Sequence, residues 1–538
     1  MQYSLLDAEK QEKAFNLLDE PWIIATDIGG QTGEFSLVDI FARAHELKGL
    51  AGEMPAQDAA VLRLLLSVLY AVYTRTDEYM DAWEQEDPQG AMELWRRLWD
   101  LGRFGAKEIE EYLRQYYERF WLVHPKCPFW QVANMNKGTY YSASKLIGDL
   151  SESSNKLRLF QGRNGVHKEM LEYAEAARWV IYLNGFDDTS SKPTRGMDLP
   201  SIGAGWLGKI GIIYAVGNSL FETLMLNFAL LNRNGDLWDD GEAAWELDMP
   251  RVDERTKIGL PNNQLELLTL QSRRIFLEHK NCVIYGFRLL GGDFFDKENA
   301  FAEMMTLWRT PEKGDEYTPK RHNTAIQFWR GFASLTAEDR NKAPGIIQWL
   351  TFLKRAKHIP SRNVQICAVS VKFGDKDFFV TDIWQDDISI NAALLSELGN
   401  AWIGKIKSCL EIVERMAQIL GYLASDLAKS VGELDGKSKS NAAKEEAYFR
   451  LDMPFRDWLA AIDPETDELD TACRKLMHTV RDIIRELGRE IVAEAGVSAF
   501  VGREVGQDKN KSRYTAPEAH ARFCGKIYGL LKKEGYGD

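Results

Sequence analysis

The pattern of apolar and polar positions divides the 538-residue chain into two parts of different character. Up to about residue 387, short apolar runs that predict strands are mixed with helical patterns and long polar loops. Beyond that point apolar residues recur at helical spacing over 392–427, 443–462, 466–495 and 515–534. Long helices with short or polar connections predict a four-helix bundle. We therefore expect an α+β fold, in which a large mixed N-terminal domain of unusual fold (1–387) is followed by a four-helix bundle (388–538).

Within the mixed part, the same pattern predicts individual elements. Helical periodicity predicts helices at about 36–48, 56–74, 89–101 and 106–119. Runs of β-branched and aromatic residues predict a hairpin over 15–38 and strands at 210–215, 273–278, 282–290, 366–373 and 378–383. Polar composition predicts loops at 151–168 and 186–203, and a linker at 430–446. Loops of this length inside a domain are usually functional or disordered.

A glycine-rich segment opens the stretch Gly203–Asn232 and is followed by a strand pattern and a helix whose start is marked by Ser219 and Glu222 as a capping box. The residue types and spacing of these glycines match two nucleotide-binding motifs, but their structural context must match as well. The G-x-G-x-x-G fingerprint needs a strand before it and a helix at its third glycine, whereas here a strand follows. The phosphate-loop match ends at Gly208-Lys209 and continues with Ile210, which has no hydroxyl to bind Mg²⁺. A glycine-rich turn before a core strand is therefore the favoured interpretation.

Composition and charge narrow the class of protein. The chain has 67 Lys and Arg against 80 Asp and Glu, a net charge of −13, so any nucleic-acid contact must come from local basic patches. Six cysteines without a C-x-x-C pair predict reduced, buried thiols. The charged N-terminus is unlike a signal peptide. The longest apolar run, Ala59–Tyr73, is interrupted by Arg63 and is shorter than the ~20 residues that span a bilayer. We expect a cytoplasmic protein.

Motifs for catalysis are missing from the sequence, but basic loops are present. The eight histidines form neither H-x-H nor H-E-x-x-H, and no G-x-S-x-G elbow occurs. The acidic pairs Asp187-Asp188 and Asp386-Asp387 are interpreted as solvated turn or capping residues. Six Lys and Arg lie between Lys354 and Lys376 against one acid, and further basic residues lie in 155–168, 186–209 and 503–513. Several basic loops on an acidic chain favour a partner with a phosphate backbone.

Five segments, in their order and spacing, resemble the large subunit of the type I-E CRISPR surveillance complex, Cascade. They are FNLLDEPWI (15–23), HPKCPFWQV (124–132), GAGWLGKIG with LFETLMLN (203–227), QSRRIFL (271–277) and VKFGDKDFFVTDIWQDDISI (371–390). The resemblance implies a non-enzymatic subunit without a cofactor that acts in antiviral defence. It implies that the subunit recognises the protospacer-adjacent motif in double-stranded DNA, helps start strand separation and recruits a helicase–nuclease. The implied partners are the other Cascade subunits, the guide RNA (crRNA) and the target duplex, and no membrane.

The resemblance also assigns roles to four segments. A docking loop at 157–167 would attach the subunit to the guide end through Phe160, Arg163 and Asn164. A groove loop would contact DNA through Ser190, Ser191 and Lys192, although this sequence has fewer glycines there than the family. A second hairpin, about 286–297, offers Arg288 and Lys297 as groove-reaching cations. A wedge hairpin would place Gly374, Asp375, Lys376 and Asp377 next to the recognition sequence, with Lys376 at the tip. Some members hold zinc through two cysteine pairs, which this chain lacks, so no metal is expected.

Two other classes of protein stay open at this point. One is a nucleotide-dependent enzyme that uses the Gly203–Gly211 loop, and the other is a scaffold whose bundle only binds partners. Nucleotide binding with a thermal shift would support the enzyme. Weak, salt-sensitive duplex binding by the isolated chain, and strong binding only in a complex, would support the DNA-recognition subunit.

Overall fold

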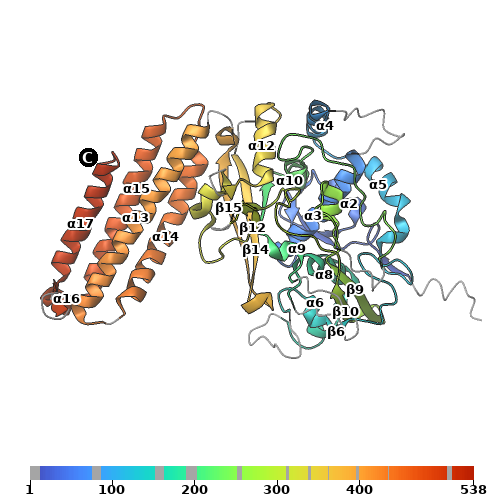
Figure 1. Ribbon diagram of the computed structural model, residues 1–538, viewed down its shortest axis with the longest axis horizontal. Helices are drawn as coiled ribbons and strands as arrows, with labels where there is room; N and C mark the ends of the chain where they lie inside the picture. Colours follow the sequence, from blue (N-terminus) through green and yellow to red (C-terminus); the bar gives the residue numbers. More distant parts are fainter. Residues whose placement is uncertain are drawn as a thin grey trace, which may run out of the picture. The chain divides into compact units, whose positions relative to one another are not determined.

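The computed structural model describes residues 13–74, 87–151, 163–189, 203–250, 257–310, 314–336, 341–360, 363–395, 399–433, 435–505 and 512–537. They form two compact units (Figure 1). The first contains the described residues of Met1–Ile326, Ser334–His358 and Gln365–Asp387. The second contains those of Gln327–Ala333, Ile359–Val364 and Ile388–Asp538. The first unit mixes helices and strands and the second is mostly helical, which confirms the predicted α+β class.

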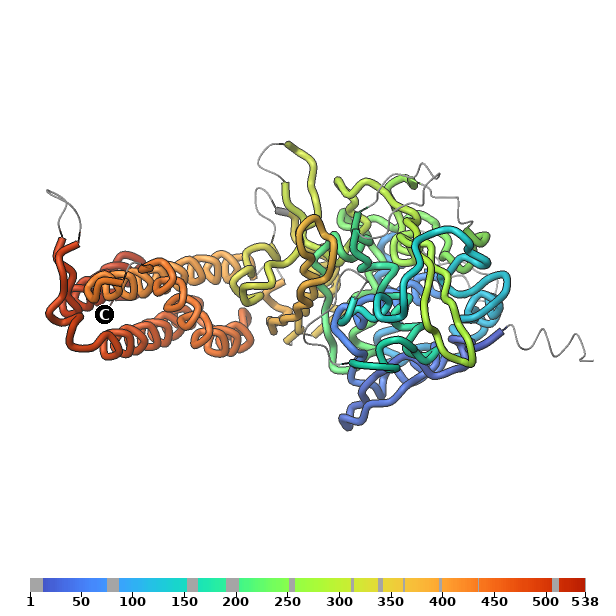
Figure 2. Tube along the Cα trace, turned by 90° about the horizontal axis from the view of Figure 1, so that it is seen from below, coloured from blue at the N-terminus to red at the C-terminus, as the bar shows by residue number. Residues whose placement is uncertain are grey.

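Short helices and small sheets alternate in the first unit. The helices are α2 (Leu37–Arg43), α3 (Pro55–Tyr73), α4 (Pro88–Leu101), α5 (Ala106–Gln115), α6 (Ala143–Leu146), α7 (Val166–Glu169), α8 (Tyr173–Phe186), α9 (Trp206–Lys209), α10 (Leu220–Asn227), α11 (Gln264–Leu268) and α12 (Gly345–Arg355). Two 3₁₀ turns are η1 (Tyr117–Phe120) and η3 (Asp375–Asp377). Colours from blue to yellow-green intermix in this unit in Figure 2, so segments far apart in sequence share one core.

The strands of this unit form several small sheets. They are β1 (Ala14–Asn16) with β5 (Trp121–Val123); β3 (Thr32–Phe35), β2 (Ile23–Asp27) and β4 (Leu47–Leu50); β6 (Thr139–Ser142), β7 (Leu171–Glu172) and β9 (Arg273–Lys280) around β10 (Val283–Gly291); β12 (Thr318–Lys320), β11 (Leu307–Arg309) and β13 (Asn341–Lys342); and β15 (Val380–Asn391), β14 (Asn363–Phe373) and β8 (Ile212–Val216). β14 pairs antiparallel with β8, and Cys367 lies opposite Tyr214.

Helix α3 is the central helix of the first unit, because it is apolar on every side and almost entirely buried. Its one charged core residue, Arg63, makes a two-pronged ion pair with Glu303 at 2.8 and 2.9 Å. Glu303 also accepts a hydrogen bond from Trp206 at 2.8 Å. By length and composition α3 is long and apolar enough to span a membrane, but 89% of its most apolar stretch is buried inside the protein. That burial is typical of a core helix.

The glycine-rich stretch folds in part as the sequence predicts. Ser219 caps α10 by accepting from the Glu222 amide at 3.2 Å, which confirms the predicted helix start. The Glu222 carboxylate accepts from the Asn218 amide at 2.7 Å, one residue before the cap. The helix ends at Asn227, before the end of the stretch Gly203–Asn232. The Asn227 side chain bonds both the amide and the carbonyl of Ala215, and this exchange fastens the helix end to β8.

Four long helices dominate the second unit and lie side by side in Figures 1 and 2. The elements are α13 (Gly399–Val431), α14 (Gly436–Ala461), α15 (Leu469–Glu494), α16 (Gly496–Val501), α17 (Ala516–Lys533), β16 (Arg503–Val505), β17 (Ser512–Tyr514) and the 3₁₀ turns η2 (Phe328–Leu335) and η4 (Ala392–Leu395). The predicted linker at 430–446 is wrong over most of its length. α14 begins inside it, where Asp435 accepts from the Ser438 amide and caps the helix.

A segment from earlier in the chain completes the core of this unit. The Trp329 indole is fully buried and stacks on Phe455 of α14 with ring centroids 4.5 Å apart. Its Nε1–H donates to Asp452 at 2.7 Å. Asn363 likewise donates to the carbonyl of Ala460 at 2.9 Å. The unit therefore includes residues from outside the range 388–538.

Candidate nucleic-acid interface

The tip of the hairpin between β14 and β15 consists of Gly374, Asp375, Lys376 and Asp377, called here the hairpin tip. The Gly374 amide donates to the Phe379 carbonyl at 2.8 Å, which closes the turn. The Asp377 amide donates back to Gly374 at 3.1 Å. Lys376 has φ 54° and ψ 29°, and its side chain is exposed. The strand–turn–strand arrangement is as predicted, with Lys376 presented to solvent.

Two residues from other segments hold the hairpin tip in place. Thr189, just after α8, donates its amide to the Asp377 carbonyl at 3.0 Å and its hydroxyl to the Lys376 carbonyl at 3.1 Å. Arg321, just after β12, pairs with the Asp377 carboxylate through both guanidinium nitrogens at 2.7 and 2.8 Å. The hairpin tip is therefore a fixed feature of the surface and presents Lys376 in one backbone conformation.

A cavity of about 640 Å³ opens beside the hairpin tip, and we call it the basic cavity. Its lining contains five cations and three acids: Lys209, Lys297, Arg309, Lys320 and Arg321 against Asp296, Glu298 and Asp377. Asp296 is already bound by Lys257 at 2.8 Å, and Asp377 by Arg321. Burial and the neighbouring Arg309 charge lower the pKa of Lys320. An excess of positive charge around a partly desolvated lysine favours binding of an anion.

The residues on either side of the predicted groove loop lie at the hairpin tip and at the basic cavity. Ser190, Ser191 and Lys192 lie outside the described residues. On one side Thr189 binds the hairpin tip, and on the other Gly203 lines the basic cavity. The Gly203 carbonyl accepts from Arg273 at 2.8 Å. The residue before the segment 190–202 is therefore held at the hairpin tip, and the residue after it lies at the basic cavity.

The acidic pair next to this loop is structural, and its interpretation as solvated turn residues is wrong. Asp187 and Asp188 are 3% and 2% exposed. Arg273 binds Asp187 at 2.5 Å, and Lys145 binds Asp188 at 2.7 Å. Burial raises the pKa of Asp187, and the Arg273 charge opposes that rise. Such fully buried pairs fix the chain leaving α8, because breaking one leaves an uncompensated buried charge.

The two candidate groove cations occupy different surroundings. Lys297 is exposed and lines the basic cavity. Arg288 lies in the middle of β10, opposite Tyr140 of β6 and Phe276 of β9, and does not line the cavity. Its guanidinium pairs with Glu278 at 2.9 Å. Of the two predicted candidates, the structure brings only Lys297 to the cavity beside the hairpin tip.

The described part of the docking loop lies on the surface. Phe160 is outside the described residues. Arg163 makes an ion pair with Glu175 of α8, which also accepts from Trp179 at 3.2 Å. Asn164 is exposed, and two apolar side chains just beyond it are also exposed: Val166 by 59% and Met170 by 44%. The Val166 and Met170 side chains are therefore available for a protein contact beside this loop.

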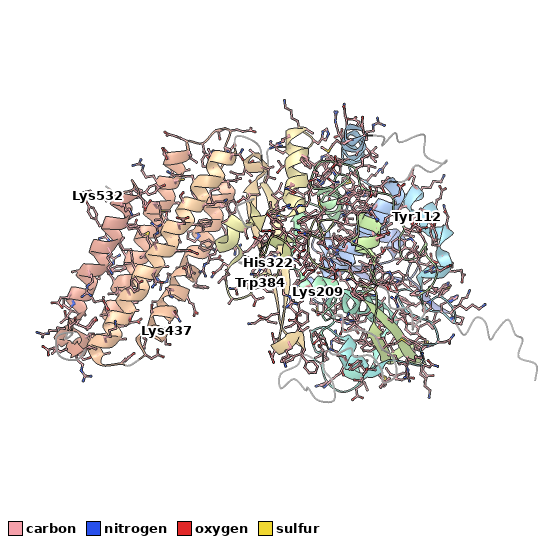
Figure 3. The ribbon with its side chains drawn as sticks, viewed as in Figure 1. Tyr112, Lys209, His322, Trp384, Lys437 and Lys532 are labelled. Carbon is pink, nitrogen blue, oxygen red and sulfur yellow. The ribbon has the colours of Figure 1, made fainter. Side chains whose placement is uncertain are left out.

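The glycines at 205, 208 and 211 have packing roles. A Cβ at Gly205 would come within 2.3 Å of the Gly185 carbonyl oxygen of α8. A Cβ at Gly211 would come within 2.8 Å of the His322 amide nitrogen, and Gly211 donates to the Lys320 carbonyl at 3.1 Å. The His322 and Trp384 rings, both labelled in Figure 3, lie 5.5 Å apart. These contacts give the glycines a reason other than a phosphate loop.

Several residues of the site have no sequence signal. Thr189, Arg309 and the adjacent residues Lys320 and Arg321 come from three separate segments, so no long run of basic residues identifies them. The strongest run, Lys354 to Lys376, is divided between the end of α12 and the β14–β15 hairpin. Within the described part of the chain, no group of three or more His, Cys, Asp or Glu side chains is arranged to hold a metal ion.

Comparison with known proteins identifies the family. A family model described as CRISPR-associated protein Cse1 matches residues 16–487. The CasA/Cse1 protein of Thermus thermophilus is 26% identical over 453 residues, 82% of this chain and 84% of that protein. The crystal structure of Thermobifida fusca Cse1 matches with a TM-score of 0.83 and 28% identity, covering 98% of this chain and 99% of that one.

A chain of a structure named CRISPR RNA-guided surveillance complex shares the fold, with a TM-score of 0.71 and 15% identity over 96% of this chain and 100% of that one. The fold and the matched model together define a CRISPR-associated protein. More particularly, the chain belongs to the Cse1 (CasA) family, and the resemblance seen in its five sequence segments is confirmed.

Proposed function

We propose that this protein is the large subunit of a type I-E Cascade surveillance complex and acts by recognition rather than by catalysis. Joined to the other subunits and the crRNA in the cytoplasm, it recognises a protospacer-adjacent motif in double-stranded DNA and helps to separate the strands. It then recruits a helicase–nuclease to the opened target. The observation that carries the proposal is the exposed Lys376 on a braced hairpin tip beside the basic cavity.

The chemistry of this surface suits duplex DNA. Phosphate contacts by Lys and Arg supply most of the affinity and orient a protein on the duplex. Five cations line the basic cavity, and Lys297 is exposed among them. The minor groove offers a degenerate base pattern, which suits a short recognition sequence. A protein wedge that separates two stacked bases must offset an unstacking cost of a few kcal/mol. Because the hairpin tip is already held in place, binding does not also have to order it.

The comparisons support the assembly part of the proposal. The family model covers most of the chain, and a chain of the RNA-guided surveillance complex has the same fold over nearly its whole length. The exposed Asn164, Val166 and Met170 beside the tethered Arg163 offer a surface for attachment to other subunits. Ser190, Ser191 and Lys192 would reach the groove from a segment whose described ends flank the hairpin tip and the basic cavity.

The decisive experiment compares two DNA targets in the assembled complex. Lys376→Ala should slow opening of a fully paired target about tenfold or more. A target whose bases beside the recognition motif are already unpaired should bind almost normally. Lys372→Ala, an exposed lysine on β14 of the same hairpin, is the matched control and should behave like the wild type. An equal loss on both targets, or no loss on either, would show that the hairpin tip is not the wedge.

A further inference from the structure

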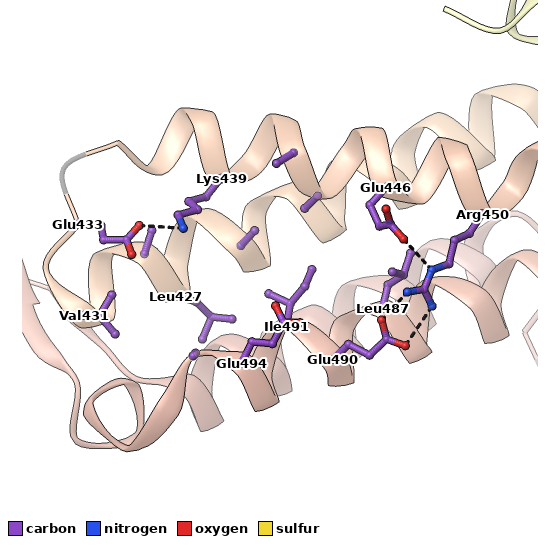
Figure 4. Close-up of a pocket in the computed structure, with 15 residues that line it drawn as sticks. Leu427, Val431, Glu433, Lys439, Glu446, Arg450, Leu487, Glu490, Ile491 and Glu494 are labelled. Atoms are coloured by element: carbon purple, nitrogen blue, oxygen red, sulfur yellow. Dashed lines mark hydrogen bonds and ion pairs between the residues drawn. The ribbon is translucent and has the colours of Figure 1, made fainter.

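The second unit contains a groove that the proposed DNA contacts do not use. It lies among α13, α14 and α15 and has a volume of about 490 Å³ (Figure 4). Its floor is made of aliphatic side chains, mostly small: Ala424, Leu427, Ala428, Val431, Ala442, Ala443, Leu487, Ile491 and Ala495. Where α14 continues toward its C-terminal end, Leu451, Phe455 and Leu459 are fully buried. The small side chains of the N-terminal half of α14 therefore leave a hollow beside the helix, whereas larger side chains fill the bundle farther along.

The rim of this groove is acidic. Four glutamates line it, Glu433, Glu446, Glu490 and Glu494, against the two cations Lys439 and Arg450. Figure 4 shows both cations engaged: Lys439 with Glu433 at 3.5 Å, and Arg450 with Glu446 at 2.8 Å and with Glu490 at 2.7 Å. Glu494 is exposed and has no ion-pair partner among the residues that the structure describes. The lining thus carries two more negative than positive charges, while its floor is apolar.

Apolar surface continues in the chain directly after the groove. Ala495 is followed by α16, in which Val497 is 82%, Phe500 53% and Val501 65% exposed. Three large exposed apolar side chains on one short helix are uncommon on a protein surface and favour a contact with a partner. An occupant that lies along the groove and reaches past Ala495 would cover these side chains as well.

We propose that this groove binds a basic amphipathic helix of a partner protein. The groove-facing part of α14 runs from Lys439 to Arg450, about 16 Å at 1.5 Å per residue, which is about three turns of a bound helix. A helix in a groove inserts apolar side chains at i, i+4 and i+7. Lysines or arginines beside those anchors would contact Glu494 and also Glu446 and Glu490, which share Arg450. A purely apolar occupant would leave the acidic rim desolvated, and an acidic one would be repelled.

The test uses the full chain and a fluorescent peptide of leucine and lysine whose leucines recur at i, i+4 and i+7. Fluorescence anisotropy should detect saturable binding of this peptide. Ala442→Phe fills the groove from an exposed position, and Glu494→Lys reverses the unpaired charge. Each should weaken the peptide about tenfold or more, which corresponds to about 1.4 kcal/mol. Circular dichroism melts should match the wild type, since neither residue is buried.

Two controls separate groove binding from general attraction to an acidic protein. Asp457→Lys reverses the charge of an exposed acid elsewhere on α14 and should change the affinity less than twofold. A scrambled peptide of the same composition, with its leucines spread around the helix, should bind at least tenfold more weakly. Equal binding of both peptides, equal loss in all three variants, or no binding of the amphipathic peptide would overturn the proposal.

Discussion

Arg321 and Asp377 form a two-pronged ion pair that joins the chain after β12 to the hairpin tip, with distances of 2.7 and 2.8 Å. The Arg321 guanidinium also lies 5.1 Å from the Phe373 ring centroid at the base of the same hairpin. The pair secures an uncommon backbone, because Lys376 and Asp377 have φ values of 54° and 56°. Left-handed backbone at non-glycine residues costs on the order of 1 kcal/mol each. Arg321 and the Thr189 hydrogen bonds offset that cost and fix where Lys376 lies.

The first prediction concerns this ion pair. Arg321→Gln should speed hydrogen exchange at the Asp377 and Phe378 amides, whose bonds to Gly374 and Asp375 close the turn. The melting temperature should barely change, because the paired side chains are 32% and 36% exposed and such pairs contribute about 0–1 kcal/mol. Arg309→Gln removes another cation of the same cavity without touching Asp377, so it should leave these amides unchanged. Exchange that is insensitive to Arg321 would mean that Thr189 alone fixes the hairpin tip.

The second prediction concerns Arg309 and Lys320. If the basic cavity binds backbone phosphates, replacing both residues with glutamine should weaken duplex binding by the assembled complex. It should also reduce the slope of log affinity against log salt by about two, at roughly one unit per phosphate contact. Arg355→Gln with Lys357→Gln removes the same charge from the end of α12, inside the strongest basic run of the sequence. That control should leave the slope unchanged, whereas equal effects in both pairs would indicate a general charge effect.

The sequence predicts elements best where one pattern is long and unambiguous. The helices at 56–74 and 89–101 and the strands at 282–290 and 366–373 match α3, α4, β10 and β14 within about three residues. The start of α14 is missed because its first turns carry lysines, serines and asparagine, whose polarity is typical of a linker as well as of an exposed helix face. The helix predicted at 36–48 ends at Arg43, because the following residues pair as β4 with β2.

The candidate site likewise has one part that local sequence predicts and other parts that depend on contacts between distant segments. The hairpin tip is predictable, since a turn sequence between two β-prone runs is a local signal. The basic cavity is not, because the neighbours of Lys320 are set by the pairing of β11 with β12 and by a hydrogen bond from the Gly211 amide, which is distant in sequence. The burial of Asp187 and Asp188 also cannot be predicted from the neighbouring sequence. It depends on Arg273 and Lys145, which are 86 and 43 positions away.

The third prediction concerns the docking loop. Replacing Phe160, Arg163 and Asn164 together with alanine should reduce incorporation of the protein into the guide-RNA complex about tenfold or more, measured by co-purification. The isolated fold should persist, because the described residues of this segment are not buried. Arg43→Ala, which breaks an exposed ion pair with Glu46, is a control of similar surface character. Normal incorporation of the triple variant would refute the assignment of this loop.

The fourth prediction concerns Trp329. Because its indole is fully buried against Phe455 and bonded to Asp452, Trp329→Ala should destabilise the helical unit by about 3–5 kcal/mol. A fragment that begins at residue 388 lacks this side chain and should melt at a correspondingly lower temperature than the same unit in the full chain. Trp329→Phe keeps the stacking and should recover most of the loss. A fragment as stable as the intact unit would show that the earlier segments contribute little.

The last prediction concerns His322 and pH. The imidazole is partly buried, its Nε2–H donates to the Ile212 carbonyl at 3.1 Å, and its ring lies 5.5 Å from that of Trp384. Burial, aided by the Lys320 charge, lowers the pKa of His322 to about 4, although the bond to Ile212 opposes the shift. In the unfolded chain the pKa is ~6.5, so the unfolded state binds more protons between these values. The stabilising contribution is therefore complete above pH 6.5 and declines as the pH falls toward 4, by about 2 kcal/mol at pH 5.

His322→Phe keeps a ring against Trp384 and removes the titration. Its loss of unfolding free energy between pH 7 and pH 5 should therefore be about 2 kcal/mol smaller than that of the wild type, measured by urea denaturation with tryptophan fluorescence. His167→Phe changes an exposed histidine and should retain the wild-type pH dependence. An identical decline in His322→Phe would show that other groups account for the loss of stability in acid.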